Sequence, residues 1–103
     1  AYLYRLQDAI NTNDFGLVRD SLKEGSPLYN DQKKLVAKLY NSGTEEEVVQ
    51  FSVNSWKQNG REATIKTTEK INIIKGGKEQ LKTYHWTYHA AIEDGRLLLT
   101  SIE

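Results

Sequence analysis

The spacing of apolar residues changes once along this chain, from a helical period in the first third to a strand period afterwards. In the first third, apolar side chains recur every three or four positions in three short runs, which predicts helices near 2–11, 14–24 and 27–42. Ser26 and Pro27 suit the start of the third helix, because serine caps a helix N-terminus and proline fits its first position. The runs are Leu3, Leu6 and Ile10, then Phe15, Val18 and Leu22, and then Leu28, Leu35, Val36, Leu39 and Tyr40.

The rest of the chain alternates apolar and polar residues and predicts strands near 45–57, 61–75, 78–93 and 96–102. Glycine turns separate these strands, which predicts an antiparallel meander in which neighbours along the sequence pair. The turns contain Asn59-Gly60, Gly76-Gly77 and Asp94-Gly95.

The Gly76-Gly77 turn fixes the register of the second and third strands. A two-residue loop there pairs Ile73 with Gln80 and Glu69 with Tyr84. One face of the pair is then apolar and the other polar, and a slip of one residue would destroy this sorting. The apolar face carries Ala63, Ile65, Ile71, Ile73, Tyr84, Trp86, Tyr88, Ala90 and Ile92.

The Asn59-Gly60 turn needs a different loop. A two-residue loop would place Val53 opposite Lys66, so that core residues of one strand would meet the polar face of the next. We therefore predict a three-residue loop with Gly60 in the left-handed conformation, which places Val53 opposite Ile65. This register directs three residues inward, namely Val49, Phe51 and Val53. The turn before the fourth strand leaves both loop lengths open, because Leu97-Leu98-Leu99 is apolar on both faces.

Helices followed by a curved antiparallel sheet resemble the NTF2-like (cystatin-like) superfamily of α+β cones. The resemblance implies one domain over residues 1–103, with three N-terminal helices packed on the concave face of a bent four-stranded meander. More narrowly, nearly the whole chain, in which four long strands follow the run quoted next, is similar to the C-terminal extracellular domain of the TcaA/YvbJ family of Gram-positive bacteria. The similar run is Asp14-Phe15 … Gly25-Ser26-Pro27-Leu28-Tyr29 … Gln32 … Leu39-Tyr40-Asn41-Ser42-Gly43.

This resemblance implies a domain excised from a longer membrane-anchored protein and located on the outer face of the cell membrane. Because staphylococcal members are linked to glycopeptide (teicoplanin) susceptibility, it also implies a cell-wall component or an envelope protein as the partner. The shared motifs are caps, turns and core positions, so they transfer no catalytic residue. The resemblance leaves the oligomeric state open and implies no membrane contact by the domain itself.

Composition excludes several classes of function. Fourteen basic residues balance fourteen acidic ones, so the chain lacks the positive charge that nucleic acid requires. With no cysteine it has no disulfide, thiolate zinc site or cysteine nucleophile. His85 and His89 would lie about 13 Å apart on one strand, too far to share a metal ion. We expect neither a metal nor a cofactor.

Glu69 is the candidate for chemistry, because the register places it on the apolar face. Lys82 lies one diagonal step away on the same face. A carboxylate in such surroundings has a raised pKa and suits a general acid or base. The alternative is a structural carboxylate bonded to Lys82 or to a tyrosine hydroxyl. We expect the structural role, with a filled interior and a near-normal pKa for Glu69.

Tyr84, Trp86 and Tyr88 form an aromatic stripe at strand spacing. Such a stripe lines a pocket for a sugar, peptide or apolar ligand, or it packs as core beneath helices. Trp56 is expected on the polar face, partly exposed, where a tryptophan hints at a partner surface.

The sequence therefore predicts a non-catalytic, extracytoplasmic binding or scaffold domain of a membrane-anchored envelope protein. The alternative is a small-molecule-binding or enzymatic NTF2-like domain that uses an interior carboxylate. The candidate ligand-lining residues are Glu69, Lys82, Tyr84, Trp86 and Tyr88.

Overall fold

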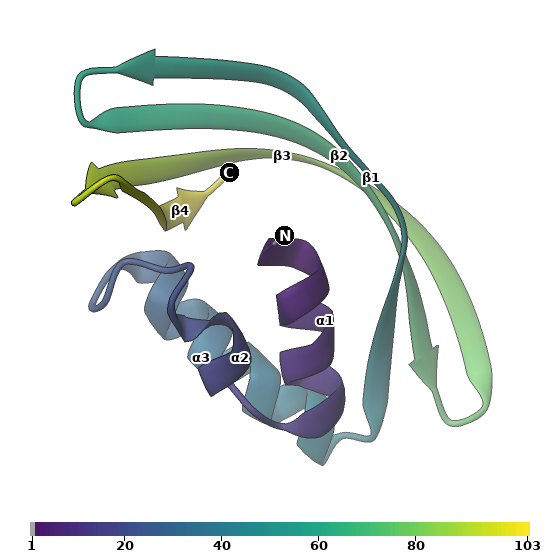
Figure 1. Cartoon of the computed structure of the whole chain (residues 1–103). Coiled ribbons are helices and arrows are strands. Elements are labelled where there is room, and N and C mark those ends of the chain that lie inside the picture. The colour runs from purple at the N-terminus through teal and green to yellow at the C-terminus, as the bar shows by residue number, and fades with distance from the viewer. Residues whose placement is uncertain (1) are drawn as a thin grey trace.

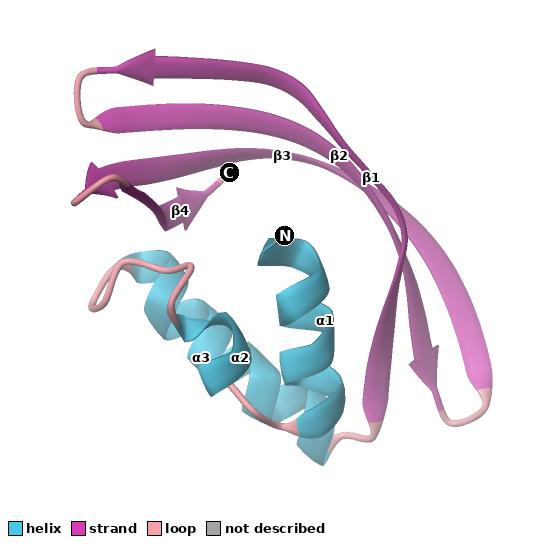
Figure 2. Ribbon diagram, in the orientation of Figure 1, coloured by secondary structure: helices cyan, strands magenta, loops and turns pink. Residues whose placement is uncertain are grey.

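The chain folds as three helices followed by a four-stranded antiparallel sheet in the order β1-β2-β3-β4. The computed structural model describes residues 2–103. The sheet bends over the helices, which lie on its concave side (Figure 1; Figure 2). This confirms the predicted α+β meander. The elements are α1 (Tyr2–Thr12), α2 (Gly16–Arg19), α3 (Pro27–Asn41), β1 (Thr44–Asn59), β2 (Glu62–Lys75), β3 (Lys78–Glu93) and β4 (Arg96–Ile102).

The long helices α1 and α3 match their predicted ranges. The Ser26 hydroxyl accepts a hydrogen bond from the Tyr29 amide at 3.2 Å, and Pro27 is the first helical residue. The predicted helix over 14–24 is wrong beyond residue 19, because α2 has only four residues. The chain after it turns into the sheet instead, and Leu22 forms a parallel bridge with Leu99 of β4. Leu22 is buried in this extended segment, so the spacing of Phe15, Val18 and Leu22 is compatible both with a continued helix and with a bridge to β4.

The predicted register of β2 and β3 is confirmed. Ile73 pairs with Gln80 and Glu69 pairs with Tyr84. Gly76 and Gly77 form the two-residue turn, both with positive φ, as a type I′ turn requires. The predicted apolar face is buried or half-buried throughout. The turn before β4, left open by the sequence, also has two residues, because Glu93 pairs with Arg96.

The predicted three-residue loop between β1 and β2 is wrong. Asn59 pairs with Glu62, so the loop consists of Gly60 and Arg61. Gly60 does have the expected positive φ, at 64°. The register then shifts twice along β1, once between Val48 and Gln50 and once between Val53 and Ser55. Each shift is a β-bulge, which adds one residue to β1 without a partner on β2.

The two bulges change which residues of β1 face inward. Val53 pairs with Thr67 rather than Ile65, and Val49 lies in the first bulge, half-exposed rather than inside. The two-residue loop, rather than a bulge, pairs Trp56 with Ile65 on the concave side, so the predicted place of Trp56 on the polar face is wrong. The inward positions follow an alternating spacing of two and three residues: Glu46, Val48, Phe51, Val53 and Trp56.

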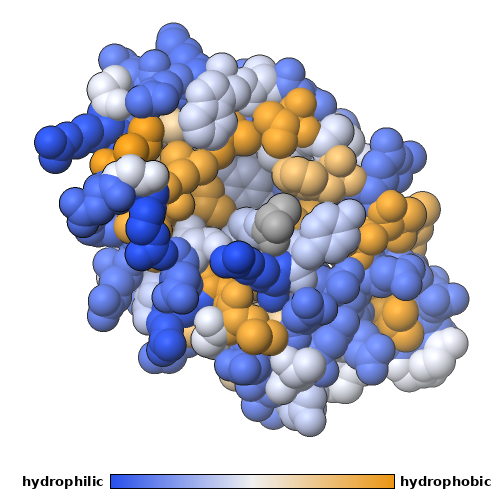
Figure 3. Space-filling model, in the orientation of Figure 1, coloured by the Kyte–Doolittle hydropathy of each residue, from blue (hydrophilic) through white to orange (hydrophobic). Residues whose placement is uncertain are grey.

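Apolar side chains of the helices and the sheet meet in one core, whose most completely buried members are Ile10, Leu28, Val18 and Val36. Helix α1 is also tied to the free edge of β1 by hydrogen bonds. The Gln7 side chain accepts from the Val48 amide at 2.6 Å, and the Asn11 side chain bonds both the amide and the carbonyl of Glu46. The space-filling view shows apolar side chains gathered around a hollow in this face of the molecule (Figure 3).

Candidate functional site

Two pockets lie between the concave face of the sheet and the helices, so the expectation of a filled interior is wrong. We name them after one residue each. The Trp56 pocket has a volume of about 360 Å³ and is lined by Tyr2, Leu3, Ser21, Phe51, Val53, Trp56, Ile65, Thr67, Tyr88, Leu97 and Leu99. The Glu69 pocket has a volume of about 320 Å³ and is lined by Tyr2, Leu3, Leu6, Gln32, Leu35, Glu46, Glu69, Ile71, Tyr84, Trp86, Tyr88 and Ile102.

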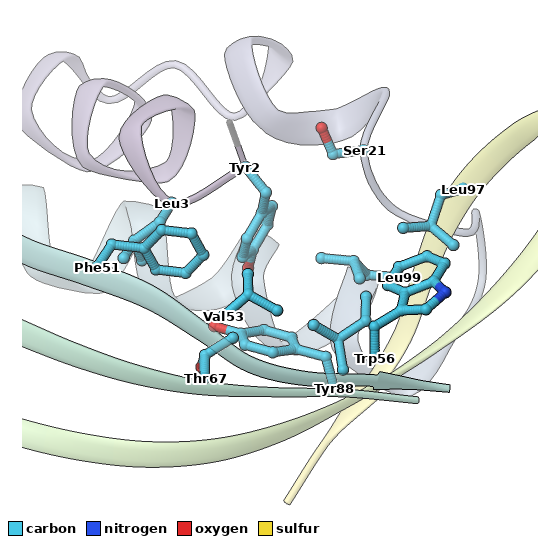
Figure 4. Close-up of a pocket in the computed structure, with 11 residues that line it drawn as sticks. Tyr2, Leu3, Ser21, Phe51, Val53, Trp56, Thr67, Tyr88, Leu97 and Leu99 are labelled. Carbon is cyan, nitrogen blue, oxygen red and sulfur yellow. The ribbon is translucent and has the colours of Figure 1, made fainter. Parts of the chain in front are cut away.

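The Trp56 pocket is mostly apolar and open to solvent. Tyr2 descends from the start of α1 toward the sheet, and Trp56 and Leu97 close the opposite side (Figure 4). The side chains of Val53 and Trp56 remain 53% and 52% exposed although they face the concave side. The β1 bulge between Val53 and Ser55 helps to form this pocket, because without it Val53 and Phe51 would point to the convex face.

Glu69 is held inside the domain by two hydroxyl groups. It is only 2% exposed. The Tyr88 hydroxyl donates to Glu69 Oε2 at 2.6 Å, and the Thr67 hydroxyl donates to the same oxygen at 2.9 Å. The predicted bond to a tyrosine hydroxyl is therefore present. Lys82 is exposed, pairs with Ile71 and lines neither pocket, so the structure does not bring it to Glu69.

The ionisable groups of the Glu69 pocket are all shifted toward their neutral forms. Burial raises the pKa of Glu69, and the hydrogen bonds from Tyr88 and Thr67 only partly oppose this, so the expected near-normal pKa is wrong. Burial also raises the pKa of Glu46, and the charge of Glu69 adds to the effect. The pKa of Tyr2 and that of Tyr88 rise for the same two reasons, burial first and the Glu69 charge second. Both hydroxyls therefore remain protonated at neutral pH.

Two buried polar atoms in this pocket have no hydrogen-bond partner among the described residues, namely the Tyr2 hydroxyl and Gln32 Oε1. Gln32 is only 8% exposed, and buried side-chain oxygens are normally hydrogen-bonded. No lysine, arginine or histidine from residues 2–103 lines the pocket. Over the same residues, no group of three His, Cys, Asp or Glu side chains is placed to hold a metal ion.

The aromatic stripe combines the two roles that the sequence left open, because its residues line the Glu69 pocket and also pack in or against the core. Tyr84 and Trp86 stack with ring centroids 5.3 Å apart, and Tyr88 meets Tyr2 edge to face at 5.9 Å. Sequence reasoning missed Tyr2, Glu46 and Gln32. Gln32 did carry a signal, because a polar residue between the apolar positions 28 and 36 of a helix lies on its buried side.

No helix within the described part of the chain is long and apolar enough to cross a bilayer. Comparison with known proteins gives the wider context. The family described as the TcaA protein NTF2-like domain matches residues 1–103. The "uncharacterized membrane protein YvbJ" of Bacillus subtilis (strain 168) is 49% identical over 104 residues. The match covers all of this chain but only 17% of YvbJ.

Solved structures with the same fold are distant in sequence. The intermembrane space region of the chloroplast protein ARC6 has a TM-score of 0.77 at 13% identity, with 99% of this chain and 89% of that chain covered. A ketosteroid isomerase-like protein from Erwinia carotovora atroseptica SCRI1043 has a TM-score of 0.73 at 10% identity, with 98% and 87% covered. An NTF-2 like protein of unknown function from Shewanella oneidensis MR-1 has a TM-score of 0.64 at 15% identity, with 98% and 90% covered.

These structures establish the cystatin-like cone, while the match over residues 1–103 and the identity to YvbJ establish the family. The chain belongs to the family of TcaA NTF2-like domains.

Proposed function

We propose that this domain is a non-catalytic binding module of a longer, membrane-anchored cell-envelope protein, displayed on the outer face of the membrane. Its ligand site is the Trp56 pocket, which takes an apolar or aromatic group from a cell-wall component or an envelope protein. The identity to a membrane protein supports the setting. The Trp56 pocket carries the proposal, because an open apolar hollow with a half-exposed tryptophan is typical of a recognition surface.

The size of the Trp56 pocket limits what it holds. Small-molecule sites usually measure about 300–1,000 Å³. A volume of about 360 Å³ is near the lower end of that range and suits one aromatic side chain or a short acyl group. A whole glycopeptide antibiotic is much larger. We therefore place the link to glycopeptide response with the parent protein, on the strength of the family resemblance.

The alternative function, acid–base chemistry by Glu69, has the raised pKa in its favour. The geometry favours a structural role, because the carboxylate is already fixed by the hydroxyls of Tyr88 and Thr67 on one oxygen. The tyrosines around Glu69 are poor partners for acid–base chemistry, because their pKa values are raised further above neutral pH than usual.

Cosedimentation with two purified fractions tests the proposal. Cell walls and membranes from Bacillus subtilis are each mixed with the labelled domain, which separates a wall ligand from a membrane-protein partner. We expect Trp56→Ala to weaken binding to one fraction at least about fivefold, because tryptophan anchors commonly contribute 1 kcal/mol or more. Leu81→Ala is the matched control, because Leu81 is an exposed apolar residue that lines neither pocket. Equal binding by the domain and Trp56→Ala, or no binding to either fraction, contradicts the proposal.

A further inference from the structure

We propose that the Glu69 pocket binds a primary ammonium group on a short alkyl chain, held between the carboxylates of Glu46 and Glu69 and the free oxygen of Gln32. This site is separate from the Trp56 pocket, and the inference does not rest on the function proposed for that pocket. The two pockets share the side chains of Tyr2, Leu3 and Tyr88, which lie between them.

The charge of the pocket is the first observation. Glu46 and Glu69 both line it, and their charges influence each other, since the charge of Glu69 raises the pKa of Glu46. No basic side chain of residues 2–103 lines the pocket, and neither carboxylate is in an ion pair within that range. Buried charges are usually paired. A cationic ligand would supply the missing partner.

The unpartnered oxygen of Gln32 is the second, independent observation. Oε1 is an acceptor, it is buried, and it receives no hydrogen bond from the described residues. An acceptor in a pocket that two carboxylates also line calls for a donor, and an ammonium group offers three N–H donors. A carboxylate or phosphate ligand would instead meet three acceptors and two negative charges.

The walls of the pocket suit the rest of such a ligand. Tyr84 and Trp86, whose rings stack on each other, both line the pocket, and aromatic rings attract cations. Leu6, Leu35 and Ile71 provide an apolar wall for an alkyl chain. A volume of about 320 Å³ is sufficient for a chain of about five carbons, the length of a lysine side chain with its ammonium group. The shared chemistry is that of a free alkylamine or of a lysine-like side chain in a peptide.

NMR titration of the ¹⁵N-labelled 103-residue domain tests this inference at pH 7.5. The ligands are n-pentylamine, n-pentanol and pentanoate, which have similar size and differ in charge, and Nα-acetyl-lysine-methylamide, which separates a peptide source from a free amine. We expect saturable shifts at amides of β2 and β3 near residues 69–71 and 84–86. We expect pentylamine to bind about tenfold more tightly than pentanol, consistent with cation–π attraction in a desolvated site added to charge pairing. Pentanoate should not bind.

Variants assign the binding to the carboxylates. Glu46→Gln and Glu69→Gln should each weaken pentylamine binding about tenfold, because each removes one of two charges. Glu47→Gln is the matched control, because Glu47 is the next residue of β1 and is exposed. If Glu69→Gln fails to fold, Glu46→Gln and Gln32→Leu carry the test. Trp56→Ala should leave pentylamine binding unchanged, so failure here and failure of the Trp56 pocket proposal are distinguishable.

Three results would overturn the inference. The first is equal affinity for pentylamine and pentanol, which would mean that the pocket accepts any short chain. The second is an equal loss of affinity in Glu46→Gln and Glu47→Gln, which would mean general attraction to acidic surface. The third is an absence of saturable shifts, which would mean that water alone occupies the pocket.

Discussion

Replacing Tyr88 by phenylalanine removes one hydroxyl from the centre of the domain and leaves the ring in place. Tyr88 is 5% exposed, and its hydroxyl donates to Glu69 Oε2 at 2.6 Å. The edge-to-face contact of its ring with Tyr2 is unaffected by the change. Glu69 keeps the hydrogen bond from Thr67, so the variant leaves no carboxylate without a donor.

The cost of Tyr88→Phe depends on the charge of Glu69. A hydrogen bond to a charged group contributes about 1.5–3 kcal/mol to stability, and one between neutral groups contributes about 0.5–1.5 kcal/mol. We therefore expect a loss of about 2 kcal/mol at pH 7.5, where the carboxylate is more ionised, and of about 1 kcal/mol at pH 4. The sign follows from the pKa, because the Tyr88 bond lowers the pKa of Glu69 and so favours the ionised form.

Urea unfolding followed by circular dichroism measures this difference. With a denaturant slope of about 1–3 kcal/mol/M, a loss of 2 kcal/mol moves the midpoint by roughly 1 M. Tyr84→Phe is the matched control, because Tyr84 belongs to the same aromatic stripe and its hydroxyl makes no hydrogen bond within the described residues. A loss below about 0.5 kcal/mol at pH 7.5, or the same loss at both pH values, would refute the charged hydrogen bond.

Three further predictions concern pH, a helix–strand contact and a turn. The pKa values of Glu46 and Glu69 in the folded state are raised above the ordinary 4.5. The two side chains therefore contribute to stability below about pH 4.5, and this contribution is lost as the pH rises through the raised pKa values. The double variant Glu46→Gln/Glu69→Gln should lose this pH dependence in urea melts. Asn11→Ala removes two hydrogen bonds to β1 and should cost about 1–3 kcal/mol in the same assay, whereas a cost near zero would mean that water replaces them. Gly60→Val should cost about 1–2 kcal/mol because a β-branched residue resists positive φ, and an unchanged thermal midpoint would contradict the turn geometry.

The parts of this fold that the sequence predicted are those in which local signals agree. The Gly76-Gly77 turn and the strict alternation on both sides of it determine one register, so the inward position of Glu69 followed from the sequence. Its bond to a tyrosine hydroxyl was one of two alternatives, and the sequence did not identify Tyr88 as the donor. The predicted register of β1 was wrong because a bulge shifts the alternation by one residue, and no particular residue type marks where the bulge lies. Val48 and Val49 are both apolar, and the pattern does not show which of them points inward.

The parts of the site that sequence reasoning missed depend on packing between distant segments. Glu46 faces the interior because of its place on β1 before the first bulge, and Tyr2 and Gln32 reach the pocket because of how α1 and α3 lie under the sheet. Leu22 shows the same limit for α2, since a buried apolar residue satisfies a helix and a strand bridge equally well. The choice between helix and bridge depends on pairing with Leu99, which is distant in the sequence and is brought close only by folding.

The N-terminal third of the chain forms hydrogen bonds with both edge strands of the sheet, β1 and β4. Gln7 and Asn11 bond the edge of β1. The backbone around Leu22 bonds the edge of β4, with Lys23 N donating to Leu99 O at 2.8 Å. An uncovered strand edge is a template for pairing with another chain. If the helical segments detach, these parts of both edges become available at once, so the N-terminal third protects the domain from joining another copy sheet to sheet.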